Sequence, residues 1–75
     1  MPYDAGPSEP ERFEALARAV IDPVRRYLAR RTDAATADDV LSETLLVMWR
    51  RRHEQPADCP PAAWAMGIAR LSLAN

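Results

Sequence analysis

The sequence predicts an all-α fold, a compact bundle of about four helices, and three observations support this prediction. Apolar residues recur at three- and four-residue steps along most of the chain, which is the period of a helical stripe facing a core. The hydrophobic fraction of 48% argues against global disorder. Seven prolines confine the ordered helices to the stretches between them. With 75 residues, the chain is one domain at most.

The first helix is expected to follow a short leader. Residues 1–7 contain two prolines, a glycine and little apolar material, which predicts a flexible leader before a domain over residues 8–75. Residues 8–11, Ser-Glu-Pro-Glu, have the form of a capping box. The apolar phase continues across Asp22 and Pro23, which predicts two helices, or one kinked helix, with Asp22 capping the second piece. The stripe consists of Phe13, Leu16, Ala17, Val20, Val24, Tyr27 and Leu28.

A second helix is expected from Thr36 to about Arg52. Thr36 is expected to cap it, while Asp38 and Asp39 complement the positive end of the helix dipole. Its buried stripe is Ala37, Val40, Leu41, Thr44, Leu45 and Met48. The opposite face carries an exposed row of Asp39, Glu43, Leu46 and Arg50. Capping and solubility would explain the acids alone, but the outward leucine makes a mixed patch suited to a basic, partly apolar partner helix.

A polar loop over residues 53–61 is expected next, because three prolines interrupt the apolar pattern there. The last helix is expected to start near Pro61 and to reach the terminus. It is apolar on two sides and therefore predicted to be central, with Trp64, Ile68 and Leu71 on one side and Ala62, Met66, Ala69 and Leu73 on the other. A third row of small side chains with one arginine favours close approach of a backbone and contact with a phosphate; it contains Ala63, Gly67, Arg70 and Ala74.

Composition limits the classes of function. The formal net charge is -1, so contact with DNA must come from a local cluster and not from an overall basic field. His53 and Cys59 are too isolated to make a metal site. No nucleophile with its base and no glycine-rich phosphate loop is visible, so neither an enzyme nor a cofactor is expected. The single cysteine and the lack of an apolar N-terminal stretch predict a cytoplasmic protein without membrane contact.

Two segments together resemble region 2 of ECF-type (extracytoplasmic function) bacterial sigma factors. The family commonly carries A-E-D-hydrophobic-hydrophobic-Q-E-T-F-hydrophobic-x-A-W and then a helix of the form W-L-x-G-I-A-R. The matching residues here are Asp39, Glu43, Thr44, Trp49, Trp64, Gly67, Ile68, Ala69 and Arg70. Ser42, Leu45 and Leu71 stand where the family usually has glutamine, phenylalanine and asparagine. The resemblance covers residues 13–75, and its specificity lies in the joint occurrence of both segments.

The resemblance implies two binding surfaces. The clamp helices of the largest catalytic subunit of core RNA polymerase would contact Asp39, Ser42, Glu43 and Leu46. The non-template strand of the promoter -10 element would contact Arg50, Arg51, Arg52, His53, Trp64, Gly67 and Arg70. A plainer interpretation stays open for each: the arginines as a solvated helix end, His53 as a solvent-facing residue, and Trp64, like Trp49, as core packing.

The function that the resemblance implies is that of a transcription initiation factor domain, which binds core polymerase and recognises and helps to melt the -10 element. The chain has no counterpart of the domain that reads the -35 element, so a fragment is expected. The alternative is a protein-interaction module that titrates an anti-sigma factor or core polymerase without supporting initiation. The two interpretations differ in whether Arg51, Arg52 and Arg70 are needed.

Overall fold

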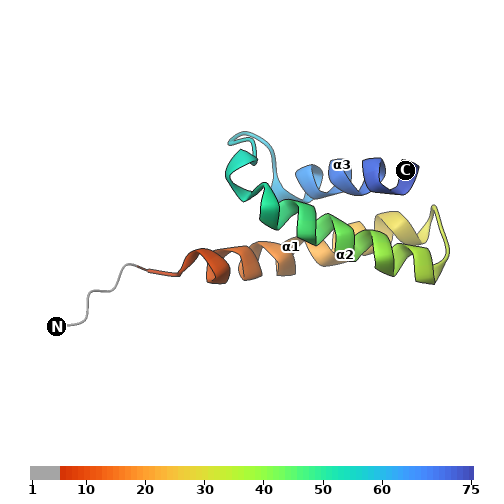
Figure 1. Cartoon of the computed structure of the whole chain (residues 1–75), viewed down its shortest axis with the longest axis horizontal. Coiled ribbons are helices and arrows are strands. Elements are labelled where there is room, and N and C mark those ends of the chain that lie inside the picture. The colour runs from red at the N-terminus through yellow and green to blue at the C-terminus, as the bar shows by residue number, and fades with distance from the viewer. Residues whose placement is uncertain (1–5) are drawn as a thin grey trace.

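Three α-helices make up almost all of the described structure. The computed structural model describes residues 6–75, so most of the predicted leader lies outside the described residues. The helices are α1 (Glu9–Ala29), α2 (Ala34–Arg50) and α3 (Pro61–Ala74), with a short 3-10 turn, η1 (Arg52–Glu54), directly after α2 (Figure 1). Each α-helix packs against the other two. The all-α prediction is confirmed, with three α-helices in place of about four.

The first helix begins at the predicted capping box and does not break at its proline. The Glu11 N–H donates to the Ser8 hydroxyl at 3.3 Å, and the Ser8 N–H donates to the Glu11 carboxylate at 2.7 Å. Helix α1 then continues through Pro23, so the two-helix alternative is wrong and Asp22 lies inside the helix, where it caps nothing. Burial on both sides of the proline offsets the backbone hydrogen bond that proline cannot make. The buried residues are Val20, Val24 and Leu28.

The second helix starts earlier than expected because Asp33, and not Thr36, is its cap. The Asp33 carboxylate accepts a hydrogen bond from the Thr36 N–H at 2.7 Å. An aspartate at this position satisfies a free N–H group and places negative charge at the positive end of the helix. Thr36 therefore lies in the first turn, and α2 ends at Arg50, two residues before the predicted end.

The core is built from one stripe of each helix. From α2 it receives Val40, Leu41, Thr44 and Met48, as predicted, and the Thr44 hydroxyl donates to the Val40 carbonyl at 2.7 Å. The last helix begins at Pro61, as predicted, and its small residues Ala65 and Ala69 are completely buried. The prediction that Leu71 belongs to an apolar, buried side of this helix is wrong, because 67% of its surface is exposed. Trp64 packs partly buried against the core.

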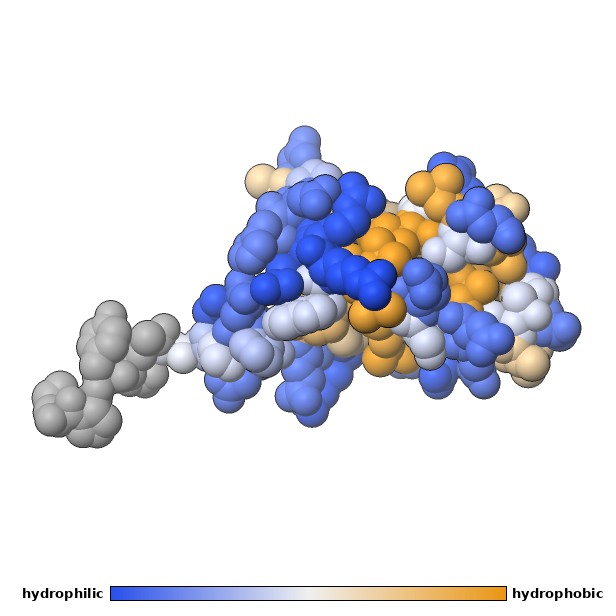
Figure 2. Space-filling model, viewed as in Figure 1, coloured by the Kyte–Doolittle hydropathy of each residue, from blue (hydrophilic) through white to orange (hydrophobic). Residues whose placement is uncertain are grey.

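Polar and apolar side chains are unevenly distributed over the face of the molecule that Figure 2 draws. Figure 2 shows a hydrophilic end at the start of α1 and around the turn after α2, while apolar surface gathers where α2 and α3 pack together. The segment predicted as a loop contains the turn η1 at its start and is otherwise irregular up to Pro60. Among the described helices, none has both the length and the apolar character that crossing a bilayer requires.

The two N-terminal caps predict sensitivity to acid. Hydrogen bonds from the Ser8 backbone and side chain lower the pKa of Glu11, and those from the Thr36 side chain and backbone lower the pKa of Asp33. A carboxyl group with a lowered folded-state pKa stabilises the fold above its unfolded pKa of about 4, and this contribution is lost as the pH falls through the folded value. We therefore expect the melting temperature to fall in acid from about pH 4 downward.

The double variant Glu11→Gln/Asp33→Asn tests the origin of this acid sensitivity. Both replacements keep a polar side chain at the cap but remove the titrating group, so the melting temperature should depend less steeply on pH than in the native chain. Asp38→Asn changes an exposed acid that caps no helix, and it should leave the native pH dependence in place. An equal flattening in both variants would contradict the assignment to the caps.

Candidate functional site

The exposed row of α2 lies opposite its buried stripe. Asp39, Ser42 and Glu43 are exposed, and Leu46 keeps 42% of its surface exposed. Neither carboxylate of the row has an ion-pair partner among the described residues. Two uncompensated negative charges therefore stand beside an apolar side chain, an arrangement that suits a helix carrying both cations and apolar groups. The predicted exposure of the row is confirmed.

The arginines at the end of α2 differ in what they contact. Arg50 is exposed and has no ion-pair partner among the described residues. Arg51 forms an ion pair with Glu54, with 3.0 Å between the charged atoms. The Arg52 guanidinium lies over the Trp49 ring, 3.9 Å from its centroid, and its Nη1 donates to the Trp49 carbonyl at 2.7 Å. Arg52 is therefore held by its own helix end, whereas Arg50 is free to meet a partner.

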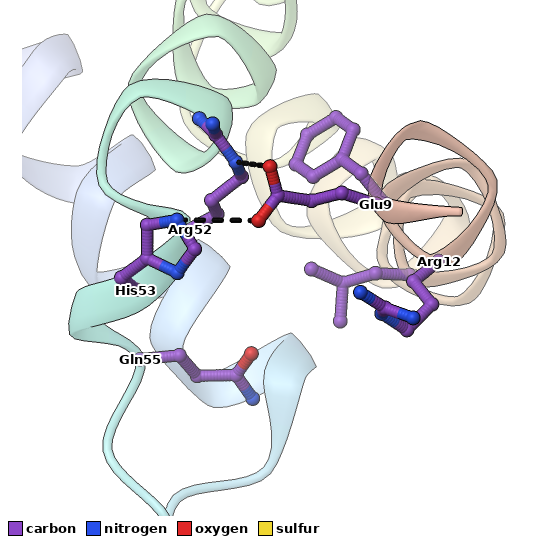
Figure 3. A pocket seen from close by; sticks show the side chains of 7 residues that line it. Glu9, Arg12, Arg52, His53 and Gln55 are labelled. Carbon is purple, nitrogen blue, oxygen red and sulfur yellow. Dashed lines mark ion pairs between the residues drawn. The ribbon is translucent and has the colours of Figure 1, made fainter. Parts of the chain in front are cut away.

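Arg52 and His53 also share one carboxylate from the start of α1. The Nε of Arg52 lies 3.0 Å from Oε1 of Glu9, and the Nε2 of His53 lies 3.2 Å from Oε2 of the same side chain (Figure 3). The Arg52 Nε has no hydrogen-bond partner in spite of the short distance, so this contact is an ion pair without an aligned hydrogen bond. Glu9 thus joins α1 to the turn η1.

A cleft of about 310 Å³ opens between the start of α1 and the segment around η1, and we call it the α1–η1 cleft. Its lining residues are Glu9, Arg12, Phe13, Leu16, Arg52, His53 and Gln55. Phe13 packs edge-on against Trp49 with 5.2 Å between ring centroids, so the apolar wall belongs to the junction of α1 with α2. The cleft combines apolar walls with an amide and with charged groups of both signs, and ligand sites commonly combine an apolar lining with a few polar groups in this way.

A second, smaller hollow of about 230 Å³ lies between α1 and α3. It is lined by Tyr27, Ala63, Met66, Gly67 and Arg70. The surface at Gly67 is open, since a Cβ atom added there would meet no heavy atom within 4 Å. The predicted row of small side chains with one arginine therefore forms an accessible surface on α3.

The structure separates the residues predicted to bind DNA into two groups. Arg52 and His53 meet in the α1–η1 cleft, with Arg50 and Arg51 preceding them on the same chain segment. Gly67 and Arg70 line the hollow between α1 and α3. Trp64 lines neither and packs against the core, which agrees with the interpretation of this tryptophan as packing.

Sequence reasoning missed the central role of Glu9. It treated this residue only as part of a capping box, although its carboxylate contacts two residues of the predicted DNA-binding set. No local pattern could have indicated this, because the partners lie on a segment far along the chain. Among the described residues, no group of three or more histidine, cysteine, aspartate or glutamate side chains is placed to hold a metal ion.

Comparison with known protein families gives one match. The family model described as Sigma-70 region 2 matches residues 12–75, which is most of the chain. The matched range includes the exposed row of α2, the hollow between α1 and α3, and all of α3. It also includes every lining residue of the α1–η1 cleft except Glu9. Neither the search of curated proteins nor the search of solved structures finds a match.

The contacts of Arg52 predict a structural role that Arg50 does not share. Replacing Arg52 with alanine removes the stacking on Trp49 and the ion pair with Glu9, so we expect the free energy of unfolding to fall by about 1 kcal/mol. Arg50→Ala should change it by less than about 0.5 kcal/mol. Urea denaturation followed by tryptophan fluorescence measures both, and equal losses would contradict the structural role of Arg52.

Proposed function

The chain belongs to the sigma-70 region 2 family, and on that premise we propose that it is an ECF-type domain that binds core RNA polymerase and captures the opened -10 element of a promoter. Sigma-70 region 2 is a domain of transcription initiation factors and not an enzyme family. The observation that carries the proposal is the arrangement along α2. An acidic and apolar row without ion pairs to the described residues occupies its outer face, and a cleft lined by Arg12, Arg52 and His53 together with Glu9 adjoins its C-terminal end.

The row on α2 is the proposed contact with the polymerase. Asp39 and Glu43 have no ion-pair partner within residues 6–75, and Leu46 is already exposed, so docking removes apolar surface from water without breaking an ion pair of the described structure. A basic and partly apolar surface, as the clamp helices of the largest polymerase subunit would provide, complements this row. Ser42 is shorter than the glutamine usual in the family, so we expect one side-chain hydrogen bond fewer and a lower affinity.

The α1–η1 cleft and the segment after it are the proposed site for single-stranded DNA. A basic groove follows the phosphates, and an apolar wall can receive an unstacked base, with stacking worth about 1–3 kcal/mol per base. Phe13 and Leu16 provide the apolar wall, and His53 and Gln55 also line the cleft. Because an unstacked base exists only in opened DNA, binding it favours the melted promoter over the duplex. Synthesis of RNA remains the task of the polymerase, and a cytoplasmic location is part of this proposal.

A second candidate function has specific support. Arg51 and Arg52 are paired with internal carboxylates, and the formal net charge is -1, so the free domain lacks a strong field for DNA. A protein-interaction module that titrates an anti-sigma factor or core polymerase would have these properties. In that case the acidic and apolar row of α2 would matter, and the arginines would not.

Charge reversal on α2 tests the polymerase contact. We expect Glu43→Arg to abolish binding of the domain to the isolated clamp-helix segment, because a cation would face the basic partner surface. Glu14→Arg makes the same change on α1, outside the row, and should bind about as tightly as the native chain. Circular dichroism confirms that both variants are folded. Absence of binding by the native chain at high concentration would contradict the polymerase proposal.

Removing exposed arginines tests the DNA contact and separates the two functions. We expect Arg50→Ala and Arg70→Ala to weaken binding of single-stranded promoter DNA in the presence of core polymerase. Each lost phosphate contact should reduce the slope of log K against log salt by about 0.7. Arg70 lies on α3, outside the row of α2, so Arg70→Ala should leave binding to the clamp-helix segment unchanged. Salt-insensitive DNA binding without sequence preference would favour the interaction module instead.

A further inference from the structure

The carboxylate of Glu9 stands where an anion is expected in the α1–η1 cleft. One of its oxygens lies 3.0 Å from Arg52 Nε and the other lies 3.2 Å from His53 Nε2, which is a cation when protonated (Figure 3). Both partners belong to the set of residues predicted to contact the promoter strand. A phosphate group offers the same pattern of two or more negatively charged oxygens to such side chains. Glu9 therefore occupies contacts that a phosphate would need.

Arg52 does not depend on Glu9 for its position. Its guanidinium is stacked on Trp49, and its Nη1 is bonded to the Trp49 carbonyl, so two contacts within the end of α2 hold it in place. The contact between Arg52 and Glu9, by contrast, lacks an aligned hydrogen bond. Removal of the Glu9 carboxylate would consequently leave the Arg52 guanidinium in place and free the side of it that now faces Glu9.

The ion pairs with Glu9 are open to exchange. The side chains are 39% exposed for Glu9, 74% for His53 and 27% for Arg52, so water and an incoming anion can reach all three side chains, although the Arg52 Nε atom itself is buried. Ion pairs this exposed contribute little to stability, roughly 0–1 kcal/mol each, and are weakened further by salt. A phosphate can therefore replace the carboxylate without a large cost in folding free energy.

We propose that Glu9 competes with nucleic-acid phosphate for Arg52 and His53 and so restrains DNA binding by the free domain. This inference rests on the proposed function of the cleft as a site for single-stranded DNA and adds a regulatory element to it. Arrival of the strand moves the carboxylate into solvent, and the two side chains then contact a phosphate. The restraint is intramolecular, because the carboxylate belongs to α1 and its two cationic partners belong to the segment around η1 of the same chain.

Fluorescence anisotropy with a labelled single-stranded oligonucleotide of mixed sequence, titrated over a range of salt, tests the competition. We expect Glu9→Gln to bind about two- to tenfold more tightly than the native chain, the effect of losing one or two exposed ion pairs. The slope of log K against log salt should become steeper, because more cations then release counterions from the DNA. Glu14→Gln is the matched control, since it removes the same charge from α1 at a residue whose ion pair in the described structure is with Arg18.

A double-mutant comparison distinguishes competition from a general effect of charge. In an Arg52→Ala background the gain from Glu9→Gln should shrink, because the contested cation is gone. Equal gains for Glu9→Gln and Glu14→Gln, or weaker binding by Glu9→Gln, would overturn the competition while leaving the DNA site in place. Absence of DNA binding by the native chain and by every variant would overturn the proposed DNA function, and the competition with it. Circular dichroism melting of each variant confirms that the comparisons concern folded protein.

Discussion

The burial of one face of α2 is the constraint on which the rest of the structure depends. Val40, Leu41, Thr44 and Met48 fix the rotation of this helix against α1 and α3. Once the rotation of α2 about its axis is fixed, the opposite row must face solvent. The last turn of α2 then places Trp49 against Phe13. The exposure of the row and the position of the cleft therefore both follow from the orientation in which α2 packs. A small rotation of α2 would bury carboxylates and expose the core.

The junction around Trp49 connects stability with the candidate DNA site. The indole packs against Phe13 of α1 in an edge-to-face arrangement, and Arg52 lies over the indole ring. The aromatic pair forms part of the fold, while the arginine lines the cleft. Because the same guanidinium is stacked, hydrogen-bonded and ion-paired, its geometry is set before any ligand arrives. Preorganisation of this kind reduces the side-chain entropy lost when a partner binds.

The two candidate surfaces differ in whether their charged side chains form ion pairs within the domain. The acids on the α2 row have no partners among the described residues, so their charge is fully available to a basic partner. The cations near η1 are largely neutralised by nearby acids, through Arg51 with Glu54 and Arg52 with Glu9. Under the proposed function, a domain arranged in this way favours the protein partner over bare nucleic acid. This order of preference agrees with the family to which the chain belongs, whose members act on DNA as part of a polymerase.

The sequence by itself determined the helices, their buried stripes, the Ser8 capping box and the exposed row, because each depends on spacings within one helix. It did not determine that α1 continues through Pro23, since burial at distant contacts outweighs a local backbone preference. It also could not place Leu71 in solvent, because exposure depends on where the neighbouring helices end. Above all, only the tertiary structure brought Glu9 to Arg52 and His53. Contacts between residues far apart in the chain depend on how helices pack, and no short-range pattern records that geometry.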